Sequence, residues 1–513
     1  MTATLLPARG GRRGLEAAML LFAALLATGA FAAVTYAHDA SFPVQIVYYG
    51  AGFVVLFLAA HLAVRRFAPF ADPLFLPLMA ALSGIGLAMI YRIDLANADS
   101  AERAGRTVPA AFAPLQMMWT LVSVALFIGV LILVKDHRAL ARYSYTAGLV
   151  GILLLLLPAA PGIGATINGA RLWLRLGPIT FQPSEISKLL LLIFFAGFLM
   201  RKRDVLSVVT RSILGIPFPR ARDLGPVLIA WGASLGMLLI ENDLGQGILV
   251  FGMFLAVLYV ATERVSWVII GLLLAAAGGV LAFYTMPHVQ PRFEIWLHAF
   301  QGNNPHAASY QLVQGLFGLA NGGILGTGWG QGAPQIVPFA NTDFMMSSLG
   351  EELGLTGVMA ILTIYLLLVM RGLRAAIGVR DSFGKLLAVG LAFSLGLQVF
   401  IIVGGVMRLI PLTGITLPFL SYGGSSTLSN FMLVALLVRI SDAGRRPPTP
   451  ATPLVDPAAA PDLIAATGPE PAQPADTSAG GAPETPSPTA PTKPTAPIAP
   501  AAPSAPGSGE RAP

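Results

Sequence analysis

The sequence predicts an all-α polytopic protein that crosses a membrane about 12 times. Only 11% of its 513 residues are charged and 55% are hydrophobic, with a mean hydropathy of +0.73. Soluble domains carry roughly 25% charged residues, so this chain lacks the charged surface that a soluble protein of its length needs. The apolar residues also gather in runs of about 20, the length of a membrane-spanning helix.

Twelve such runs follow one another along the chain. The first one follows Arg12 and Arg13 and could pass for a signal peptide. Its apolar stretch is too long for one and more runs follow, so we expect a retained span. Two runs near the middle are closely spaced, which leaves a range of 10 to 12 spans. The predicted spans are 15–37, 45–64, 73–91, 114–134, 143–160, 183–200, 225–241, 244–261, 266–286, 352–370, 385–406 and 418–440.

The basic residues predict the orientation of these spans. With the N-terminus in the cytoplasm, 22 of the 32 Lys and Arg residues fall in cytoplasmic segments and 7 in external ones. Such a positive-inside bias predicts that both termini are cytoplasmic and that the long loop at 287–351 is extracytoplasmic. The net charge of +7 therefore marks orientation, and we expect no nucleic-acid partner. The external basic residues are Arg92, Arg103, Arg106, Arg171, Arg175, Arg292 and Arg408.

The composition changes near residue 447. Nineteen of the 40 prolines lie in 447–513, among Ala, Thr, Ser and Gly. Such a segment buries too little apolar surface to offset the entropy of ordering, so we expect a disordered cytoplasmic tail. A tether is favoured over a docking segment for a partner that recognises extended Pro-rich chain. The chain has no cysteine, which excludes disulfides and cysteine nucleophiles.

The long loop at 287–351 carries the most distinctive carboxylate. It is rich in glycine, with 8 glycines between Gly315 and Gly332, and loops of this length are usually functional. Asp343 lies in the segment Asn341-Thr342-Asp343-Phe344 near its end. Such a residue can cap the next helix or act as an acid or base, and the chemistry alone leaves both roles open.

Three further polar clusters lie at external ends of spans. Glu185 and Lys188 share one helix face, where they form either a self-neutralising pair that fixes packing or a substrate contact. Asp243 lies in a turn between two spans, where solvated Asn, Asp and Gly are common. Ser421 and Gly424 belong to a segment of small residues that suits close helix packing or chemistry.

External arginines are a fourth feature, because the orientation bias disfavours them there. Arg171, Arg175, Arg292 and Arg408 could bind the phosphate of an anionic lipid, or pair with headgroups and nearby acids. Nearly all unusual polar residues thus converge on the external face, which disfavours cytoplasmic chemistry. A transporter would typically place ionisable residues at mid-membrane.

Several motifs follow one another over residues 73–446. They are Asn168-Gly169-Ala170-Arg171-Leu172-Trp173, Gln182-Pro183-Ser184-Glu185 with Lys188, Asp243-Leu244-Gly245, Tyr310-Gln311, Gly322-Gly323, Gly326-Thr327-Gly328, Thr342-Asp343-Phe344, Glu351-Glu352-Leu353-Gly354 and Ser421-Tyr422-Gly423-Gly424-Ser425. Their order and spacing resemble the RodA/FtsW/SpoVE family, the SEDS peptidoglycan glycosyltransferases. The two spans before residue 73, the Pro-rich tail and two cytoplasmic motifs, Lys135-Asp136-His137-Arg138 and Arg380-Asp381-Ser382-Phe383-Gly384-Lys385, look most like the RodA-type proteins of actinobacteria.

The resemblance implies a polymerase of lipid II on the outer face of the cytoplasmic membrane, active in cell elongation and shape maintenance. It also implies a class B penicillin-binding protein as partner transpeptidase, with contacts to membrane lipid and to other elongation or division machinery. The chain would then divide into an N-terminal segment with two extra spans (1–72), the polymerase core (73–446) and the tail (447–513). The family's essential Asp falls on Asp343, and its Glu–Lys pair falls on Glu185 and Lys188.

Departures from the family pattern occur beside these residues. Asn341 stands where the family often has His, 241–246 replaces a Gln-Pro-Asp-Leu-Gly-Thr segment, and Arg292 is the second arginine of a pair whose first is absent.

The expected reaction is one displacement with inversion at the muramoyl C1 of lipid II. Asp343 would act as base or orient the acceptor hydroxyl, while Arg171, Arg292 and Lys188 would meet the pyrophosphate. A divalent cation, Mg²⁺ or Mn²⁺, on Asp343 is an alternative, and no organic cofactor is expected. A lipid II flippase and a non-catalytic scaffold are the rival functions. The other predicted substrate-binding residues are Glu185, Asp243, Gln311, Ser421 and Gly424.

Overall fold

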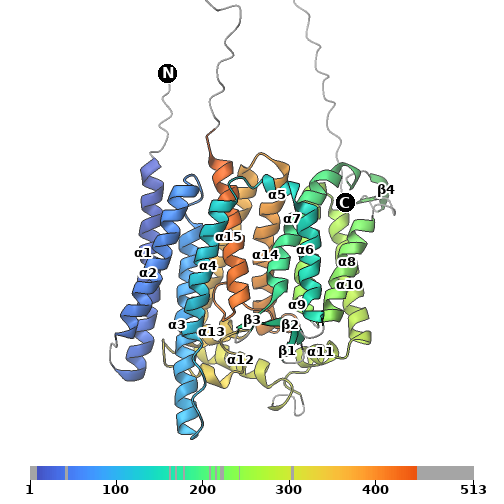
Figure 1. Ribbon diagram of the computed structural model, residues 1–513. Coiled ribbons are helices and arrows are strands. Elements are labelled where there is room, and N and C mark those ends of the chain that lie inside the picture. Colours follow the sequence, from blue (N-terminus) through green and yellow to red (C-terminus); the bar gives the residue numbers. More distant parts are fainter. Residues whose placement is uncertain are drawn as a thin grey trace, which may run out of the picture. The chain divides into compact units, whose positions relative to one another are not determined.

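The computed structural model shows a bundle of long helices that run side by side (Figure 1). The predicted tail lies outside the described residues apart from its first position. The described residues are 9–40, 44–160, 163–167, 170–176, 179–206, 209–213, 216–219, 224–241, 243–301 and 306–447.

Every predicted span falls on a helix. Ten of the helices in the described ranges are long and apolar enough to cross a membrane. The other two predicted spans correspond to α6 and α8, of 13 and 17 residues. The helices on predicted spans are α1 (Arg9–Asp39), α2 (Gln45–Phe67), α3 (Phe75–Arg103), α4 (Ala113–Leu133), α6 (Ser144–Leu156), α7 (Pro183–Leu206), α8 (Gly225–Glu241), α9 (Leu244–Thr262), α10 (Val265–Thr285), α13 (Met345–Gly378), α14 (Ser382–Val406) and α15 (Gly424–Arg445).

Shorter helices connect these spans. Helix α6 continues into a 3₁₀ turn at Leu157–Ala159. The large loop contains two helices that lie across the end of the bundle (Figure 1). The connecting helices are α5 (Ala139–Arg142), α11 (Gln290–Leu297) and α12 (Tyr310–Gly322), with a 3₁₀ turn at Pro334–Ile336.

Two predicted span boundaries were wrong. The span predicted from 418 begins only at Gly424, because Phe419 has a φ of 66° and the Pro418 carbonyl accepts a hydrogen bond from Tyr365 instead of starting a helix. The span predicted from 352 belongs to the 34-residue helix α13, which starts at Met345. Its first turns are buried against other parts of the protein, so hydropathy alone could not find the helix start.

Two small antiparallel sheets were not predicted. One contains β1 (Gly164–Ile167), β2 (Ala170–Leu176) and β3 (Ile179–Phe181), in the order β1-β2-β3. The alternation of Arg and Leu along β2 has the two-residue period of a strand. The other contains β4 (Val209–Ile213) and β5 (Ile216–Pro219).

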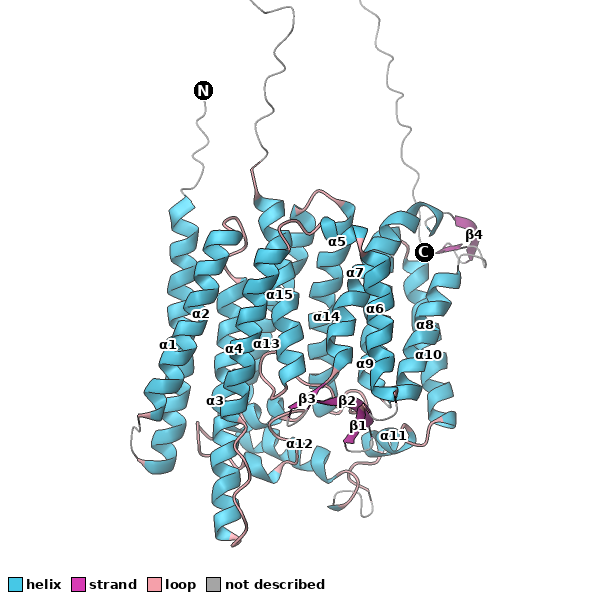
Figure 2. Cartoon of the chain, viewed as in Figure 1, coloured by secondary structure: helices cyan, strands magenta, loops and turns pink. Residues whose placement is uncertain are grey.

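The bundle has two ends with different contents. The described start of α1 and the end of α15 lie at one end, here called the terminal end, together with β4 (Figure 2). The opposite end carries α11, α12 and the β1–β3 sheet, and we call it the loop end (Figure 2). The predicted functional residues that the structure describes therefore have to be sought mainly at the loop end.

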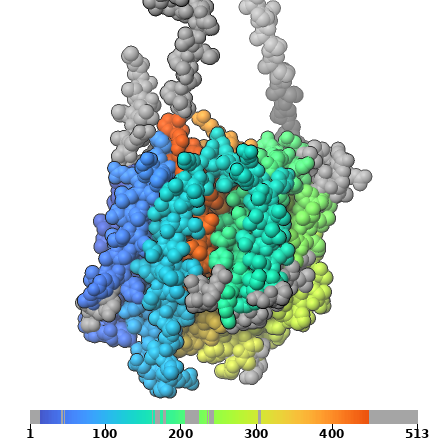
Figure 3. Space-filling view, viewed as in Figure 1, coloured from blue at the N-terminus to red at the C-terminus, as the bar shows by residue number. Residues whose placement is uncertain are grey.

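Helices α3 and α15 are the most enclosed of the ten apolar spans. Helix α1 packs on α2 and α3, α15 packs on α4, and α14 packs on α13, α9 and α7. In the space-filling view, the orange surface of α15 lies at the bottom of a groove between α4, in blue to cyan, and α6, in teal (Figure 3).

Candidate functional site

Asp343 lies at the loop end, in a turn that leads directly into α13. The segment between α14 and α15 holds this turn from one side. The Ser421 hydroxyl donates to the Thr342 carbonyl at 2.6 Å, and the Tyr422 amide donates to the Asn341 carbonyl at 2.7 Å. The position of the Asp343 backbone is therefore fixed by residues almost 80 positions away.

Helix α12 holds the same turn from the other side. Phe344 is fully buried, and a Cβ at Gly315 of α12 would lie 2.5 Å from its ring. The Ser347 hydroxyl, one turn into α13, donates to the Gly315 carbonyl. A glycine is needed at this position because any side chain would push the Phe344 ring away and shift the adjacent carboxylate.

The structure contradicts the helix-cap role that the sequence left open for Asp343. Helix α13 begins after Phe344, and its start has no side-chain capping hydrogen bond. The Asp343 carboxylate instead faces the segment between α14 and α15. A Cβ at Gly414, which has a φ of +79°, would lie 3.7 Å from Asp343 Oδ2 and 4.0 Å from Arg292 Nη1. The Asp343 carboxylate and the Arg292 guanidinium thus both lie beside the Gly414 backbone.

Arg292 is held in this place by α11 and by a backbone contact. Its Nη1 donates to the Leu412 carbonyl at 2.8 Å, two residues before Gly414. The guanidinium is close enough to lower the pKa of both Asp343 and Asp243 through its positive charge. It is therefore the basic group of a small cluster with two carboxylates.

The two carboxylates have raised pKa values. Desolvation raises the pKa of Asp343 to about 7, Arg292 opposes the shift, and the charge of Asp243 adds to it. Burial raises the pKa of Asp243 to about 6, although the Gln246 amide and Arg292 lower it. Such pKa values near neutrality are typical of carboxyl groups that exchange protons in catalysis, and they also occur in structural clusters.

Asp243 itself caps a helix. Its Oδ1 accepts the Gln246 amide of α9 at 3.0 Å, so this residue combines an N-cap with a place in the carboxylate cluster. It is 5% exposed, which excludes the solvated turn that was the alternative interpretation of this segment.

Deeper inside the helix bundle than this cluster, Glu185 and Lys188 form a buried ion pair. Lys188 Nζ lies 2.6 Å from Glu185 Oε2, and Lys188 and Glu185 are 0% and 2% exposed. Lys188 also donates to Gln398 of α14, while Glu185 accepts from Gln246 of α9 and Ser429 of α15. These contacts agree with a self-neutralising pair that ties four helices together, whereas direct contact with a substrate stays a prediction.

The Glu185–Lys188 pair is also connected to the cluster of Asp243, Arg292 and Asp343. Gln246 joins Glu185 to the Asp243 cap, at 3.1 Å and 3.0 Å. Gln398 donates to the Thr416 carbonyl at 2.9 Å, in the segment that faces Asp343. A continuous polar network thus runs from inside the bundle to both sides of the carboxylate cluster.

The other predicted substrate-binding residues have varied positions. Ser421 holds the Asp343 turn, as described above. Gln311 donates to the Pro338 carbonyl at 3.0 Å within the large loop. A Cβ at Gly424 would overlap the Trp119 ring, so this glycine allows close helix packing. The backbone of Arg171 lies in β2, but its side chain is outside the described residues.

Comparison with known proteins identifies the family. The sequence profile of FtsW, RodA and SpoVE, described as a cell cycle protein family, matches residues 73–446. This chain belongs to the FtsW/RodA/SpoVE family. The peptidoglycan glycosyltransferase RodA of Mycobacterium tuberculosis is 49% identical over 437 residues, which cover 85% of this chain and 92% of that protein. The probable FtsW of a Geobacter species is 32% identical over 72% of this chain and 96% of that protein.

Solved structures of the FtsW/RodA/SpoVE family have the same fold. A chain from a peptidoglycan synthase complex that coordinates polymerization and crosslinking aligns with a TM-score of 0.56 and 26% identity, over 74% of this chain and 99% of that one. The rod shape determining protein RodA of Thermus thermophilus aligns with a TM-score of 0.50 at 24% identity, over 74% of this chain and 98% of that protein. The resemblance and the helical fold predicted from the sequence are thereby confirmed.

Sequence reasoning missed several residues of this family member's site. Gly414, Gln246, Gln398 and Ser429 all contact the cluster or its network. The three polar residues stand inside apolar spans, where polar side chains are costly and face the protein interior. That signal could have found them, whereas Gly414 has no signal beyond its residue type.

Proposed function

We propose that this chain is a peptidoglycan glycosyltransferase that polymerises lipid II into glycan strands on the outer face of the cytoplasmic membrane during cell elongation and shape maintenance. The observation that carries the proposal is that Asp343, with a pKa raised to about 7, and Arg292 both lie beside Gly414 at the loop end. The relatives named peptidoglycan glycosyltransferase RodA, 49% identical over most of this chain, support it.

The reaction needs a proton acceptor and a site for the leaving group. The 4-hydroxyl of the acceptor sugar attacks the muramoyl C1 of the donor, the C1–O bond breaks, and the undecaprenyl pyrophosphate departs. One displacement converts an α-linked donor into a β-1,4-linked product. Asp343 takes the hydroxyl proton, and a carboxyl group with a pKa near the working pH suits a general base. Arg292 would neutralise charge on the pyrophosphate, as a guanidinium binds phosphate oxygens in pairs.

Arg171 would be a second ligand of the pyrophosphate, because its strand lies at the loop end. Lys188 and Glu185 act through the network that links α7, α9, α14 and α15, since the pair is enclosed by these helices. Their contribution is therefore to hold the segments that carry Asp243 and Asp343.

A divalent cation, Mg²⁺ or Mn²⁺, would supply further neutralisation of the pyrophosphate. The described residues hold no group of three or more His, Asp or Glu side chains suited to a metal ion. Asp343 would be the residue that holds such an ion, and the ion would supply positive charge at the pyrophosphate. No organic cofactor is needed for this displacement.

The lipid tail of the substrate needs a path that is open to the bilayer. The groove between α4 and α6, with α15 at its bottom, runs along the bundle (Figure 3). Its floor helix α15 also carries Ser429, which contacts Glu185. We place the undecaprenyl chain of lipid II in this groove.

The orientation and the partner belong to the same proposal. Both termini would lie in the cytoplasm and the loop end outside, as the basic residues predict. The solved peptidoglycan synthase complex coordinates polymerization with crosslinking, which supports a class B penicillin-binding protein as the transpeptidase partner of this chain. Other elongation or division proteins would bind the assembled pair.

The test is an assay of glycan synthesis from labelled lipid II. It contains the purified chain and its partner penicillin-binding protein, whose transpeptidase activity has been inactivated. We expect glycan strands from wild type and at least about 100-fold less product from Asp343→Asn, since a general base contributes that much or more. Glu294→Gln is the matched control, because it removes an exposed carboxylate from α11 near Arg292. Equal polymer from Asp343→Asn and wild type would assign the base elsewhere. No polymer from any variant, beside an active control enzyme, would favour a flippase, and lipid II translocation would then be measured.

A further inference from the structure

The end of helix α1 touches the glycine-rich part of the large loop, residues 322–333, here called the glycine loop. Gly330 has a φ of +82°, and a Cβ there would lie 2.6 Å from Cβ of Ala37 and 3.5 Å from the Val34 carbonyl oxygen. The loop backbone therefore lies directly on α1, against the methyl group of Ala37. Helix α1 precedes the part of the chain that matches the family profile.

The glycine loop completes an interruption in α13. Gly354 has a φ of 67° and a ψ of −172° inside this helix, so the hydrogen bonds of the surrounding turn are broken. The loop replaces them on both sides. Thr327 and Gly328 amides donate to the Glu351 and Glu352 carbonyls at 3.0 Å and 2.9 Å. The Leu355 and Thr356 amides donate in turn to the Gly323 and Ile324 carbonyls, at 2.9 Å and 3.0 Å.

Side chains reinforce this insertion. The Gly330 amide donates to Glu352 Oε2 at 3.0 Å, and the Ala333 amide donates to Glu351 Oε1 at 3.1 Å. Arg92 of α3 donates to the Gly330 and Gly332 carbonyls at 3.1 Å and 2.7 Å and to Glu352 Oε1 at 2.9 Å. The glycine loop thus contacts α1, α3 and α13.

Helix α1 is itself fixed to α3 beside this contact. His38 Nε2 lies 3.1 Å from Asp99 Oδ1, and the ring of Phe31 in α1 lies 5.5 Å from the ring of Tyr91 in α3. Helix α1 is therefore connected to α3 beside its contact with Gly330.

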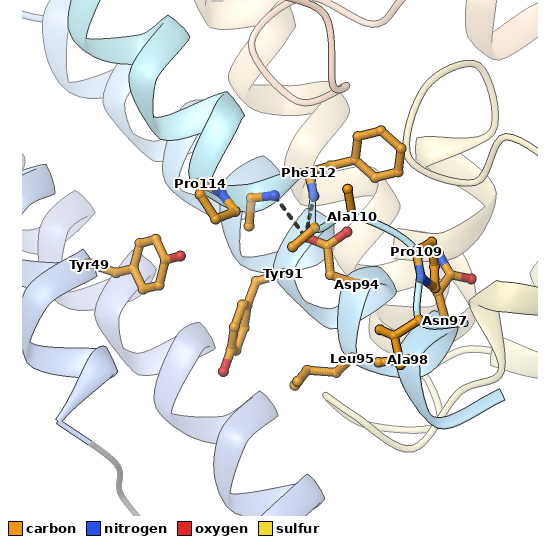
Figure 4. Close-up of a pocket in the computed structure, with 13 residues that line it drawn as sticks. Tyr49, Tyr91, Asp94, Leu95, Asn97, Ala98, Pro109, Ala110, Phe112 and Pro114 are labelled. Carbon is orange, nitrogen blue, oxygen red and sulfur yellow. Dashed lines mark hydrogen bonds between the residues drawn. The ribbon is translucent and has the colours of Figure 1, made fainter. Parts of the chain in front are cut away.

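The second added helix, α2, borders the same end of the core. Its Tyr49 lines a cavity with Tyr91 and Asp94 of α3, and Asp94 Oδ2 accepts the Phe112 and Ala113 amides at 2.8 Å and 2.7 Å (Figure 4). The Phe112 ring lies 4.9 Å from the ring of Tyr422. The Tyr422 amide holds the Asp343 turn, so α2 and α3 reach the site through this ring contact.

We propose that α1 is a positioning element for the active site. Its contact at Gly330 keeps the glycine loop in the interruption of α13, and this fixes the first turns of the helix that directly follows the Asp343 turn. Gly330 is the positioning residue in this scheme, Ala37 and Val34 are the residues of α1 that it contacts, and none of them touches substrate. The effect of α1 on polymerisation rests on the proposed function, whereas its effect on the position of the glycine loop does not.

Two alanine variants separate the contact from backbone strain. Gly330→Ala places a methyl group against Ala37, whereas Gly328→Ala has its nearest atom, Gln331 Cγ, at 3.7 Å. Both positions have positive φ, +82° and +100°, so both variants carry the strain of an L-residue there. We expect kcat of polymerisation to fall about 10-fold more in Gly330→Ala than in Gly328→Ala, with KM for lipid II changed less than about two-fold.

The rescue variant tests the partner of the contact. In Gly330→Ala the new methyl group clashes with the methyl group of Ala37. Ala37→Gly removes the second methyl group, so the double variant should recover most of the lost kcat. Ala37→Gly alone should stay within about two-fold of wild type. A double variant no more active than Gly330→Ala would overturn the proposal.

Hydrogen exchange gives a readout that does not depend on activity. In Gly330→Ala the amides of Thr327 and Gly328 should exchange at least about 10-fold faster than in wild type, because their bonds to α13 open more often. Protection should return in the double variant. Equal exchange in the two single glycine variants would overturn the proposal. Absence of polymer from wild type would reject the proposed function and leave the exchange result as the test of the contact.

Discussion

At the scale of single residues, the pKa of Asp343 is set first by desolvation and then by two neighbouring charges of opposite sign. The desolvating surroundings and Asp243 raise its pKa, and Arg292 lowers it, with a resulting value of about 7. A group with this pKa is partly ionised at neutral pH, so both its charge and its proton affinity are available to a reaction.

The pH dependence of polymerisation follows from this value. Only the carboxylate form of Asp343 can accept the hydroxyl proton, so kcat/KM should rise with pH through about 7 and then level off. Arg292→Gln removes the positive charge that lowers the pKa, so the inflection should move to higher pH while the rate falls. The measurement is initial polymerisation rate against pH for both proteins.

A control separates this local effect from a general loss of positive charge. Arg103→Gln removes a guanidinium that is 75% exposed at the end of α3, and its profile should match wild type. A rate that falls as pH rises through 7 would identify Asp343 as a proton donor and contradict the proposed role.

The Glu185–Lys188 pair makes a separate prediction about stability. Lys188→Met leaves the Glu185 charge buried without its partner, and should cost about 3–5 kcal/mol of unfolding free energy. The double variant Glu185→Gln, Lys188→Met removes both charges and keeps hydrogen-bonding capacity toward Gln246 and Ser429. It should unfold at a higher temperature than Lys188→Met, as measured by thermal unfolding in detergent. A double variant as unstable as the single one would contradict the self-neutralising interpretation.

At the scale of elements, the sequence predicted what hydropathy encodes and missed what tertiary contacts impose. All twelve apolar runs became helices, because a chain in lipid must satisfy its backbone hydrogen bonds internally. The start of α13 was missed because polar residues such as Glu351 and Glu352 are buried by the glycine loop. The strands of β1–β3 were missed because they are short and lie between two long apolar runs.

The interruption of α13 carries the prediction at this scale. Gly354→Ala would make a Cβ overlap the Gly326 amide nitrogen, at a backbone conformation that is essentially restricted to glycine. We expect a loss of about 2–5 kcal/mol of stability from strain and overpacking together, with weaker polymerisation. Gly378→Ala, in the same helix with open space around its Cβ, should be neutral or slightly stabilising. Similar thermal unfolding of the two variants would show that the glycine loop does not depend on this close approach.

At the scale of the whole molecule, the candidate site is assembled from segments that are far apart in sequence. Asp243, Arg292, Asp343 and Ser421 converge at the loop end. The sequence placed the first three in external connections and Ser421 near the external end of the last predicted span. Their mutual arrangement depends on α11, on Gly414 and on the segment before α15, and no local pattern specifies it. The enclosure of Glu185 and Lys188 likewise depends on four helices that pack together.

Orientation in the membrane is the last property at this scale, and the absence of cysteine makes it directly testable. Arg103→Cys places one thiol at the loop end, and Arg203→Cys places one at the opposite end, in the last turns of α7. Both arginines are exposed, at 75% and 54%, and each pairs with a neighbouring Asp, so the two variants are matched. The positive-inside bias predicts that a membrane-impermeant maleimide labels position 103 in intact spheroplasts and position 203 only after permeabilisation. The reverse pattern would place Asp343 in the cytoplasm, where lipid II polymerisation on the outer face is impossible.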